Sequence, residues 1–251
     1  MQVVTFNIRC DYGQDGANNF KFRKDLILKK INSEQPDFLC FQEVVPHVAL
    51  WLKENLNDYY LVGCGRESDL TGEETGIAYR KDRYNIIKME VFWLSDTPEV
   101  PGSRYVNQSE CPRTCTCIYF QELKTGKVFR IYNTHLDHIG SDARKQGLSL
   151  ILKKVSQADF LGEVPVIITG DFNAFPDSEE LAVLKDYQEL YDCTKDLDGT
   201  FHDFGTLEEF EKIDYILADK HFSCKNVSKW TDCEGGVYLS DHYPVSAVLE
   251  F

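Results

Sequence analysis

The chain lacks any apolar run that approaches the roughly 20 residues needed for a membrane-spanning helix. It also lacks a low-complexity segment, a short repeat and a linker-like stretch at which its 251 residues could be divided. Hydrophobic residues make up 43% of the sequence and aromatic residues 13%, which is typical of a packed globular protein. We therefore expect a single domain over residues 1–251, with no membrane span.

Basic residues are scarce relative to acidic ones. Lys and Arg number 27 against 41 Asp and Glu, which gives a formal net charge of −14, and no segment carries a basic run. Proteins that bind long nucleic acids neutralise phosphates with Lys and Arg, so the charge disfavours such a partner. An acidic balance suits a site that collects cations, although it is also an ordinary means of keeping a protein in solution.

The first residues carry no basic segment followed by an apolar one, as a secretory signal would. The nine cysteines are an odd, scattered set, and Cys111, Cys115 and Cys117 have no second ligand pair of the kind that zinc sites use. We expect a cytoplasmic protein with reduced thiols, in which Cys115 and Cys117 share one face of a strand. Nothing in the sequence indicates a protein partner.

Residues 164–173 are the stretch around which the remaining sequence is organised. The apolar run Val164 to Thr169 predicts a strand buried on both faces, and Gly170 then ends it, followed by Asp171 and Asn173. Open α/β sheets place their chemistry at the carboxyl ends of strands. A Gly-Asp pair after a strand is often only a turn, so the prediction of a site depends on whether other strands end in the same way.

Other predicted strands do end in polar residues that can bind a metal ion or transfer a proton. These strands and their polar residues are 3–9 with Asn7, 37–43 with Glu43, and 127–135 with His135. Towards the end of the chain, Asp214 begins a further predicted strand and Ser240-Asp241-His242 precedes the last one.

Helices are predicted between these strands. Apolar residues recur at helical spacing from Phe22 until Pro36 ends the pattern, and again over 48–56 and 148–155. Short runs separated by Gly and Pro over residues 59–120 indicate antiparallel strands. Because strand, polar end and helix recur in both halves of the chain, we predict an α/β four-layer sandwich with two similar halves. Two packed mixed or antiparallel sheets would be flanked by helices.

The polar residues at the strand ends are mainly oxygen donors. A set of carboxylates and amides without cysteine suits a hard cation such as Mg²⁺, with Mn²⁺ as a possible substitute. The two histidines beside it could transfer protons or contact a phosphate. This composition fits metal-assisted hydrolysis of a phosphoester.

The chain resembles the endonuclease/exonuclease/phosphatase superfamily of metal-dependent phosphoesterases, and the resemblance extends from end to end. Its motifs occur in family order: Thr-Phe-Asn7-Ile-Arg9, Phe-Gln-Glu43, Asn133-Thr-His135, Gly-Asp171-Phe-Asn173, Ile-Asp214-Tyr and Ser-Asp241-His242. Further segments are similar to an uncharacterised bacterial branch, namely Asp137-His138, Tyr79-Arg80-Lys81, Pro112-Arg113 and Thr200-Phe201-His202.

The resemblance implies a role for each matching residue. Glu43 would be the principal Mg²⁺ ligand, helped by Asn7 and by Asp241, directly or through water. Asp171 would orient or deprotonate the attacking water, and Asn173 would hold that water or the phosphate. The remaining catalytic roles would fall to His242, which pairs with Asp214 and contacts the phosphate or its leaving group, and to His135, which stabilises phosphoryl charge.

Four residues are candidates for substrate binding. Some nucleases of the superfamily carry an acid where this chain has Arg9, and a cation there could meet a phosphate but not a metal ion. Arg113 is a similar candidate, unless it pairs with a structural carboxylate. His138 and His202 could also contact the substrate, and Arg80 lies in a segment that could reach the site.

The predicted function is hydrolysis of a phosphate mono- or diester, with a small-molecule or headgroup-sized substrate favoured by the charge. An Mg²⁺-dependent endo- or exonuclease is the main alternative, and it would need scattered Lys and Arg gathered on one face. A non-catalytic binding module on the same fold is a further alternative. Such a module is expected to lack a motif, whereas every acidic and histidine position is filled here.

Overall fold

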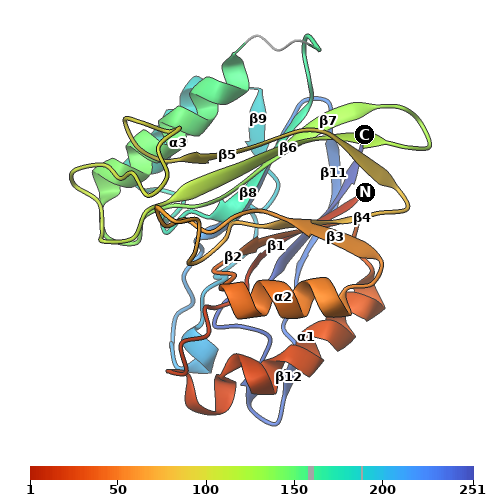
Figure 1. The fold of residues 1–251 in the computed structure, drawn as a ribbon, viewed down its shortest axis with the longest axis vertical. Helices are drawn as coiled ribbons and strands as arrows, with labels where there is room; N and C mark the ends of the chain where they lie inside the picture. Colours follow the sequence, from red (N-terminus) through yellow and green to blue (C-terminus); the bar gives the residue numbers. More distant parts are fainter. Residues whose placement is uncertain (158–160, 188) are drawn as a thin grey trace.

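The computed structural model describes residues 1–157, 161–187 and 189–251, in which two six-stranded sheets pack face to face (Figure 1). The first sheet has the order β11 (Ser223–Lys229), β14 (Val245–Glu250), β1 (Gln2–Asn7), β2 (Phe38–Gln42), β4 (Ile77–Arg80), β3 (Tyr59–Val62). The second has the order β5 (Tyr84–Trp93), β6 (Thr114–Glu122), β7 (Val128–His135), β8 (Val166–Asp171), β10 (Asp214–Asp219), β9 (Leu190–Asp192). A small hairpin joins β12 (Cys233–Glu234) and β13 (Val237–Tyr238).

Helices cover the outer face of each sheet, which gives the predicted four layers (Figure 1). The α-helices are α1 (Phe20–Glu34), α2 (Pro46–Asn55) and α3 (Ser141–Ser156), and the 3₁₀ helices are η1 (Gly16–Asn18), η2 (Glu179–Asp186) and η3 (Asp203–Gly205). The α1 and α2 helices lie against the first sheet, and α3 lies against the second. None of the helices in the described residues is long and apolar enough to cross a membrane.

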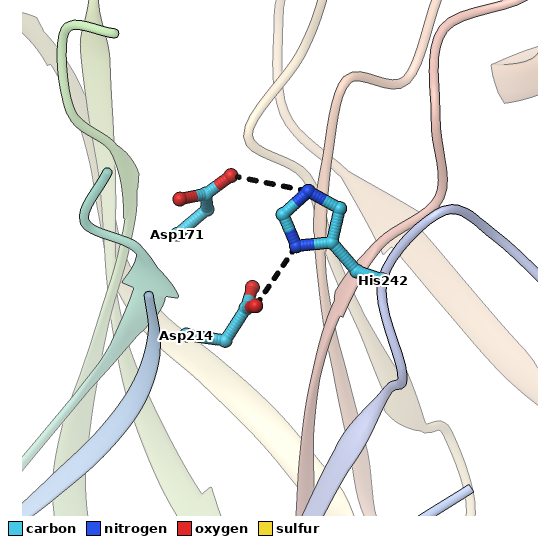
Figure 2. Close-up of side chains that lie close together, drawn as sticks. All are labelled: Asp171, Asp214 and His242. Atoms are coloured by element: carbon cyan, nitrogen blue, oxygen red, sulfur yellow. Dashed lines mark hydrogen bonds and ion pairs between the residues drawn. The ribbon is translucent and has the colours of Figure 1, made fainter. Parts of the chain in front are cut away.

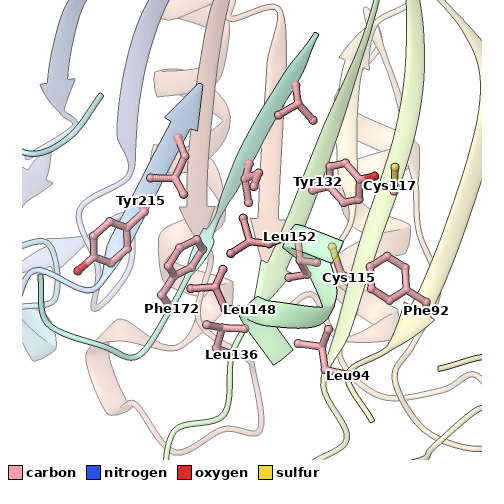
Figure 3. Close-up of a cluster of buried hydrophobic side chains, with 14 of the residues drawn as sticks. Phe92, Leu94, Cys115, Cys117, Tyr132, Leu136, Leu148, Leu152, Phe172 and Tyr215 are labelled. Carbon is pink, nitrogen blue, oxygen red and sulfur yellow. The ribbon is translucent and has the colours of Figure 1, made fainter. Parts of the chain in front are cut away.

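Three buried apolar clusters correspond to the three spaces between layers. The cluster between the sheets includes Phe38, Phe120 and Phe129. Figure 3 shows the cluster beneath α3, where Leu148 and Leu152 of the helix pack near Cys115 and Cys117 of β6. The two cysteines thus share one face of their strand, as their spacing predicted.

The two sheets repeat one strand order. In the second sheet the strands lie side by side in the order β5, β6, β7, β8, β10, β9, with α3 connecting β7 to β8, and only β7 and β8 pair in parallel. In the first sheet the same pattern is β11, β14, β1, α1, β2, β4, β3, with β1 and β2 as the parallel pair. The predicted similar halves are therefore present, with the last two long strands joining the first half.

Strand register brings the polar strand ends to one edge of the sandwich. His135 pairs with Asp171 across β7 and β8, and Asp171 pairs with Asp214 across β8 and β10. Beneath this edge, Gln42 Nε2 donates to Asn133 Oδ1 at 2.7 Å, a buried hydrogen bond between the two sheets. The edge is thus fixed by backbone pairing within each sheet and by polar contacts between them.

Candidate active site

The predicted catalytic and metal-binding residues meet at this edge of the sandwich, although they are far apart in the sequence. A cleft of about 430 Å³ opens there. Its lining includes Arg9, Glu43, Arg113, His135, His138, Asp171, Asn173, Asp241 and His242. Asn7 and Asp214 lie behind the lining and bond to residues within it.

Asn7 connects the two sheets by contacting a carboxylate of each. Its Nδ2 donates to Glu43 Oε1 at 2.9 Å and to Asp171 Oδ2 at 3.0 Å, while its Oδ1 accepts a hydrogen bond from the Arg9 backbone N–H at 3.0 Å. In this orientation the amide nitrogen faces the carboxylates. Asn7 therefore orients Glu43 and Asp171 here, and it would offer Oδ1 to a cation only if its amide turned round.

Glu43 is held as a carboxylate. Burial alone would raise its pKa, but hydrogen bonds from the Cys10 N–H and the Asn7 amide and the positive charge of His242 hold the pKa of Glu43 well below its usual range. The Cys10 N–H donates to Oε2 at 2.9 Å. Glu43 has a φ of 61° and Arg9 a φ of 63°, so both occupy the left-handed region that non-glycine residues rarely adopt. Such conformations persist only where the surroundings impose them, and they cluster at functional sites.

Figure 2 shows His242 lying between Asp171 and Asp214. The imidazole Nδ1 is 2.8 Å from Asp214 Oδ2, and Nε2 is 3.7 Å from Asp171 Oδ2. Burial lowers the pKa of an imidazole, but the negative charges of Asp214, Asp171 and Asp241 raise the pKa of His242 to about 10. His242 is therefore an imidazolium at neutral pH, and its Nε2–H is too far from Asp171 for a hydrogen bond and remains available.

Asp171 has the environment of a general base. Burial and the neighbouring Asp214 charge raise the pKa of Asp171 to about 7, against the opposing effect of His242. Asp171 Oδ1 accepts the backbone N–H of Asn173 at 2.9 Å, and Asn173 Nδ2 donates to the Leu136 carbonyl at 3.1 Å. A carboxylate with a pKa near 7 is suited to taking a proton at neutral pH.

His135 remains neutral although it faces carboxylates. Burial and the nearby Arg113 guanidinium lower the pKa of His135 well below its ordinary value. Its Nε2 lies 3.5 Å from Asp171 Oδ2. His135 and His242 thus differ in charge, because Asp214 bonds to His242 whereas Arg113 is the strongest neighbouring charge at His135.

Arg9 lines the cleft, but carboxylates occupy its guanidinium. Its Nε and Nη2 donate to Asp15, and its Nη1 pairs with Asp241 Oδ2 at 3.2 Å. The other oxygen of Asp241 accepts the Ser240 hydroxyl at 2.9 Å. Arg9 therefore orients Asp241 and contributes little free positive charge to the cleft.

Arg113 is the cleft arginine with the most unused donors. Its Nη2 donates to His138 Nδ1 at 2.8 Å, whereas its buried Nε and Nη1 have no hydrogen-bond partner. Asp137 Oδ2 lies 3.8 Å from Arg113 Nε, which is too far for a hydrogen bond. The alternative in which Arg113 pairs with a structural carboxylate is therefore represented only by this long ion pair. Because Arg113 can only donate, His138 accepts at Nδ1 and carries its proton on Nε2, if it is neutral.

The structure does not bring His202 into the cleft, in contrast to the prediction. The fully buried His202 ring stacks on Tyr243 with 3.9 Å between centroids, and its Nδ1 accepts the Gly205 N–H at 3.0 Å. Its backbone N–H donates to the Asp241 carbonyl, so His202 supports the loop that carries Asp241. Arg80 lies at the opposite end of β4 from the site and pairs with Asp82.

Two lining residues were not predicted from the sequence. Arg66 and Glu73 form an ion pair in the cleft wall, and both belong to the loop between β3 and β4. They do not follow a strand end, so the pattern that selected the other residues does not select them. Trp93 and the backbone of this loop position Arg66, through contacts that only the folded chain brings together.

The side chains present fit a hard divalent cation at Glu43. Burial is the largest cause that raises the pKa of Asp241 and of Glu73, and the negative charge of Glu43 raises both further. The cleft therefore holds carboxylates that repel one another. A cation would relieve this repulsion, and oxygen donors are the ligands that Mg²⁺ and Mn²⁺ prefer. Asp171, Asp214 and His242 also offer ligand atoms within 4.8 Å of one another. An imidazolium has no free lone pair, however, so this second group fits a hydrogen-bonded relay instead.

Comparisons with known proteins point to one family. A model described as the Endonuclease/Exonuclease/phosphatase family matches residues 4–242. The crystal structure of an endonuclease/exonuclease/phosphatase from Bacteroides vulgatus is 34% identical, with a TM-score of 0.93 over 99% of this chain and 98% of that chain. A mannosyl-6-phosphatase from Bacteroides thetaiotaomicron is 29% identical, with a TM-score of 0.91 over 100% of both chains. An uncharacterised protein of Acanthamoeba polyphaga mimivirus is 26% identical over 271 residues, covering 100% of each chain.

Proposed function

Because the chain belongs to the endonuclease/exonuclease/phosphatase family, we propose that it is a divalent-cation-dependent hydrolase that cleaves the phosphoester bond of a small or headgroup-sized substrate. Members of this family are typically hydrolases of phosphoester bonds and generally use divalent metal ions. The observation that carries the proposal is the meeting of Asp171, His242 and Glu43 at one cleft, each in a different electrostatic state.

These states match the needs of phosphoester hydrolysis. Asp171 takes the proton of the attacking water, since its pKa of about 7 makes it a base at neutral pH. Asn173 and Asn7 hold the two Asp171 oxygens in place. The His242 imidazolium donates its Nε2–H to a phosphoryl oxygen, and Asp214 keeps the imidazole charged.

Glu43 would hold the divalent cation, with Asp241 nearby and Asn7 orienting the carboxylate. When bound, the cation would neutralise charge on the phosphoryl oxygens and make the phosphorus more electrophilic. Mg²⁺ is the ion that the oxygen donors favour, and Mn²⁺ is its expected substitute.

The charges of the cleft favour a substrate with one phosphate group. The guanidinium groups of Arg9 and Arg66 are paired with carboxylates, which leaves Arg113 with two nitrogens, Nε and Nη1, that have no hydrogen-bond partner. In the proposed complex these groups bind phosphoryl oxygens, beside the neutral His135. An extended nucleic acid would need a series of free cations along its backbone. The similarity to a protein named as a mannosyl-6-phosphatase also favours a small phosphomonoester.

A substrate panel tests the proposal directly. Purified protein is incubated with phenyl phosphate, a hexose phosphate, bis(p-nitrophenyl) phosphate, a phospholipid headgroup phosphoester and a single-stranded oligonucleotide, each with Mg²⁺ and each with excess chelator. We expect hydrolysis of a small phosphoester with Mg²⁺ and its loss with chelator. The Asp171→Asn variant serves as the control for contaminating phosphatases.

Two results would overturn the proposal. Hydrolysis that survives excess chelator would exclude the divalent cation. Efficient cleavage of the oligonucleotide that falls steeply with rising salt, without turnover of the small esters, would favour the nuclease alternative and would require a backbone-binding surface outside this cleft.

A further inference from the structure

The ion pair of Arg66 and Glu73 presents a polar wall beside the proposed phosphate site. Arg66 Nη1 pairs with Glu73 Oε2 at 2.5 Å, and Nη2 donates to Oε1 at 3.0 Å. The exposed Tyr12 places its hydroxyl 3.4 Å from Oε1. A guanidinium has five N–H donors and each carboxylate oxygen can accept two hydrogen bonds, so the pair keeps donors and acceptors for a ligand.

The loop that carries the pair is preorganised by its own backbone. The Arg66 N–H donates to the Glu73 carbonyl at 3.1 Å, and Trp93 Nε1 donates to the Arg66 carbonyl at 2.6 Å. Gly65 lies so close to the opposite strand of this loop that a Cβ there would meet the Thr71 carbonyl oxygen at 2.1 Å. The two charged side chains are therefore held in one arrangement, which lowers the entropic cost of binding a ligand against them.

The pair lines the main cleft beside Glu43, Arg113 and His135. These five residues also surround a recess of about 10 Å³, too small for a substrate group, together with Glu74, Thr75, Pro112 and Thr114. Asp171 and His242 do not line it. In a displacement at phosphorus, the attacking and leaving oxygens lie roughly in line on opposite sides. If water is activated at Asp171, the leaving alcohol points towards the side where Arg66 and Glu73 lie.

The chemistry of this wall limits which leaving group it can recognise. The pair is neutral overall, so it offers no net attraction for a second phosphate. Among Phe, Tyr and Trp, Phe201 alone lines the cleft in the described part of the chain, and Tyr12 meets the pair through its hydroxyl. A nucleobase would need aromatic stacking, and a quaternary ammonium headgroup would need several aromatic faces. Sugar-like alcohols instead present adjacent hydroxyl groups that both donate and accept hydrogen bonds.

We propose that Arg66 and Glu73 form a specificity site for a polyhydroxylated leaving group, with Glu73 accepting from and Arg66 donating to adjacent hydroxyls of a sugar- or polyol-type phosphomonoester. This inference rests on the proposed phosphoester hydrolysis and assigns the part of the substrate that leaves.

The test compares two monoesters that differ in their alcohol. Hydrolysis of a hexose 6-phosphate and of phenyl phosphate is measured with Mg²⁺, and the ratio of their kcat/KM values is taken for each variant. We expect the wild-type ratio to favour the hexose phosphate. Glu73→Gln should lower this ratio about 10- to 100-fold, since hydrogen bonds to a charged group contribute on that scale.

A second variant guards against misfolding. Glu73→Gln leaves the Arg66 charge with Glu67 alone, at 3.6 Å, whereas the double variant Arg66→Met, Glu73→Gln removes both charges of the pair, and it should lose the preference to a similar extent. Glu110→Gln is the matched control, because Glu110 is exposed and pairs with Arg104 outside the cleft. It should keep the wild-type ratio.

The outcomes separate this inference from the proposed function. A wild-type enzyme that hydrolyses phenyl phosphate at least as well as the hexose phosphate would overturn the specificity site and leave the proposed function intact. A folded double variant with an unchanged ratio would do the same. Failure of the wild-type protein to hydrolyse any ester in the substrate panel with Mg²⁺ would instead overturn the proposed function, and the inference with it.

Discussion

Replacing Asp214 by asparagine should move the whole pH profile of kcat to lower pH. In the wild-type protein the Asp214 carboxylate overcomes the effect of burial and raises the pKa of His242 to about 10. Burial is the main cause that raises the pKa of Asp171 to about 7, and the Asp214 charge is the second. We therefore expect kcat to rise with pH through about 7, as Asp171 loses its proton, and to fall through about 10, as His242 loses its proton.

The size of the effect follows from the loss of one buried charge. Asp214 is the carboxylate that raises the pKa of His242 most, so without it the pKa of His242 falls, although Asp171 and Asp241 still oppose burial. Each unit by which this pKa falls moves the alkaline limb down by one pH unit, and above the new pKa kcat should drop about tenfold for each pH unit. The acidic limb should also move down, because the charge that raises the pKa of Asp171 is gone.

The assay is kcat between pH 5.5 and 10.5 for Asp214→Asn, beside the wild-type protein. Asp82→Asn is the matched control, because it removes the same charge from an exposed pair with Arg80 at the far end of the strands. The reasoning is refuted if Asp214→Asn keeps the wild-type alkaline limb, since His242 would then owe its charge to another group.

The remaining predictions concern the base, the phosphate contact and a buried histidine. Asp171→Asn should lower kcat by a factor on the order of 10² to 10⁴ with a smaller effect on KM, because it removes a proton-transfer group. Arg113→Met should act at least partly through KM, by about tenfold or more, because it removes charge-assisted contacts to the phosphate. Burial lowers the pKa of His202 from 6.5 to about 4, so protons bind the unfolded chain more readily. His202 thus stabilises the fold above pH 6.5, and this contribution, about 3 kcal/mol at most, is lost as the pH falls through about 4.

Each of these predictions has a clear contrary result. A rise in KM alone for Asp171→Asn would reassign that residue to binding, and an unchanged KM for Arg113→Met would remove it from the phosphate site. For the histidine, chemical denaturation of His202→Gln between pH 4 and 7 should show a flatter dependence of the unfolding free energy than the wild-type protein. Equal slopes would mean that other groups cause the acid sensitivity.

Sequence patterns predicted the four layers and the residues at one sheet edge for a simple reason. Parallel strands end at the same edge, so the terminal residues of β1, β2, β7 and β8 must lie near one another. Asp214 begins β10, and an antiparallel strand starts at the edge where its parallel neighbours end. Local periodicity and strand direction therefore bring Asn7 close to Glu43 and His135 close to Asp171, and the packing of the two similar halves brings the two pairs together.

The same reasoning could not determine side-chain orientation or the contribution of loops. Asn7 presents its amide nitrogen to the carboxylates, which depends on two hydrogen bonds across the sheets. His202 is adjacent in sequence to residues near the cleft but turns inward to stack on Tyr243. Arg66 and Glu73 meet only because their loop folds back on itself. These placements depend on contacts between distant segments, which periodicity does not contain.

The most direct test of the central claim is the Mg²⁺ concentration that gives half-maximal hydrolysis of a small phosphoester, measured after chelation and readdition of metal for the wild-type protein and for Glu43→Gln. Glu43→Gln removes the carboxylate expected to hold the cation, so we expect no activity without metal and at least about a tenfold higher Mg²⁺ requirement in the variant. Glu110→Gln should match the wild-type protein. An unchanged Mg²⁺ requirement in Glu43→Gln, or full activity in excess chelator, would contradict the account.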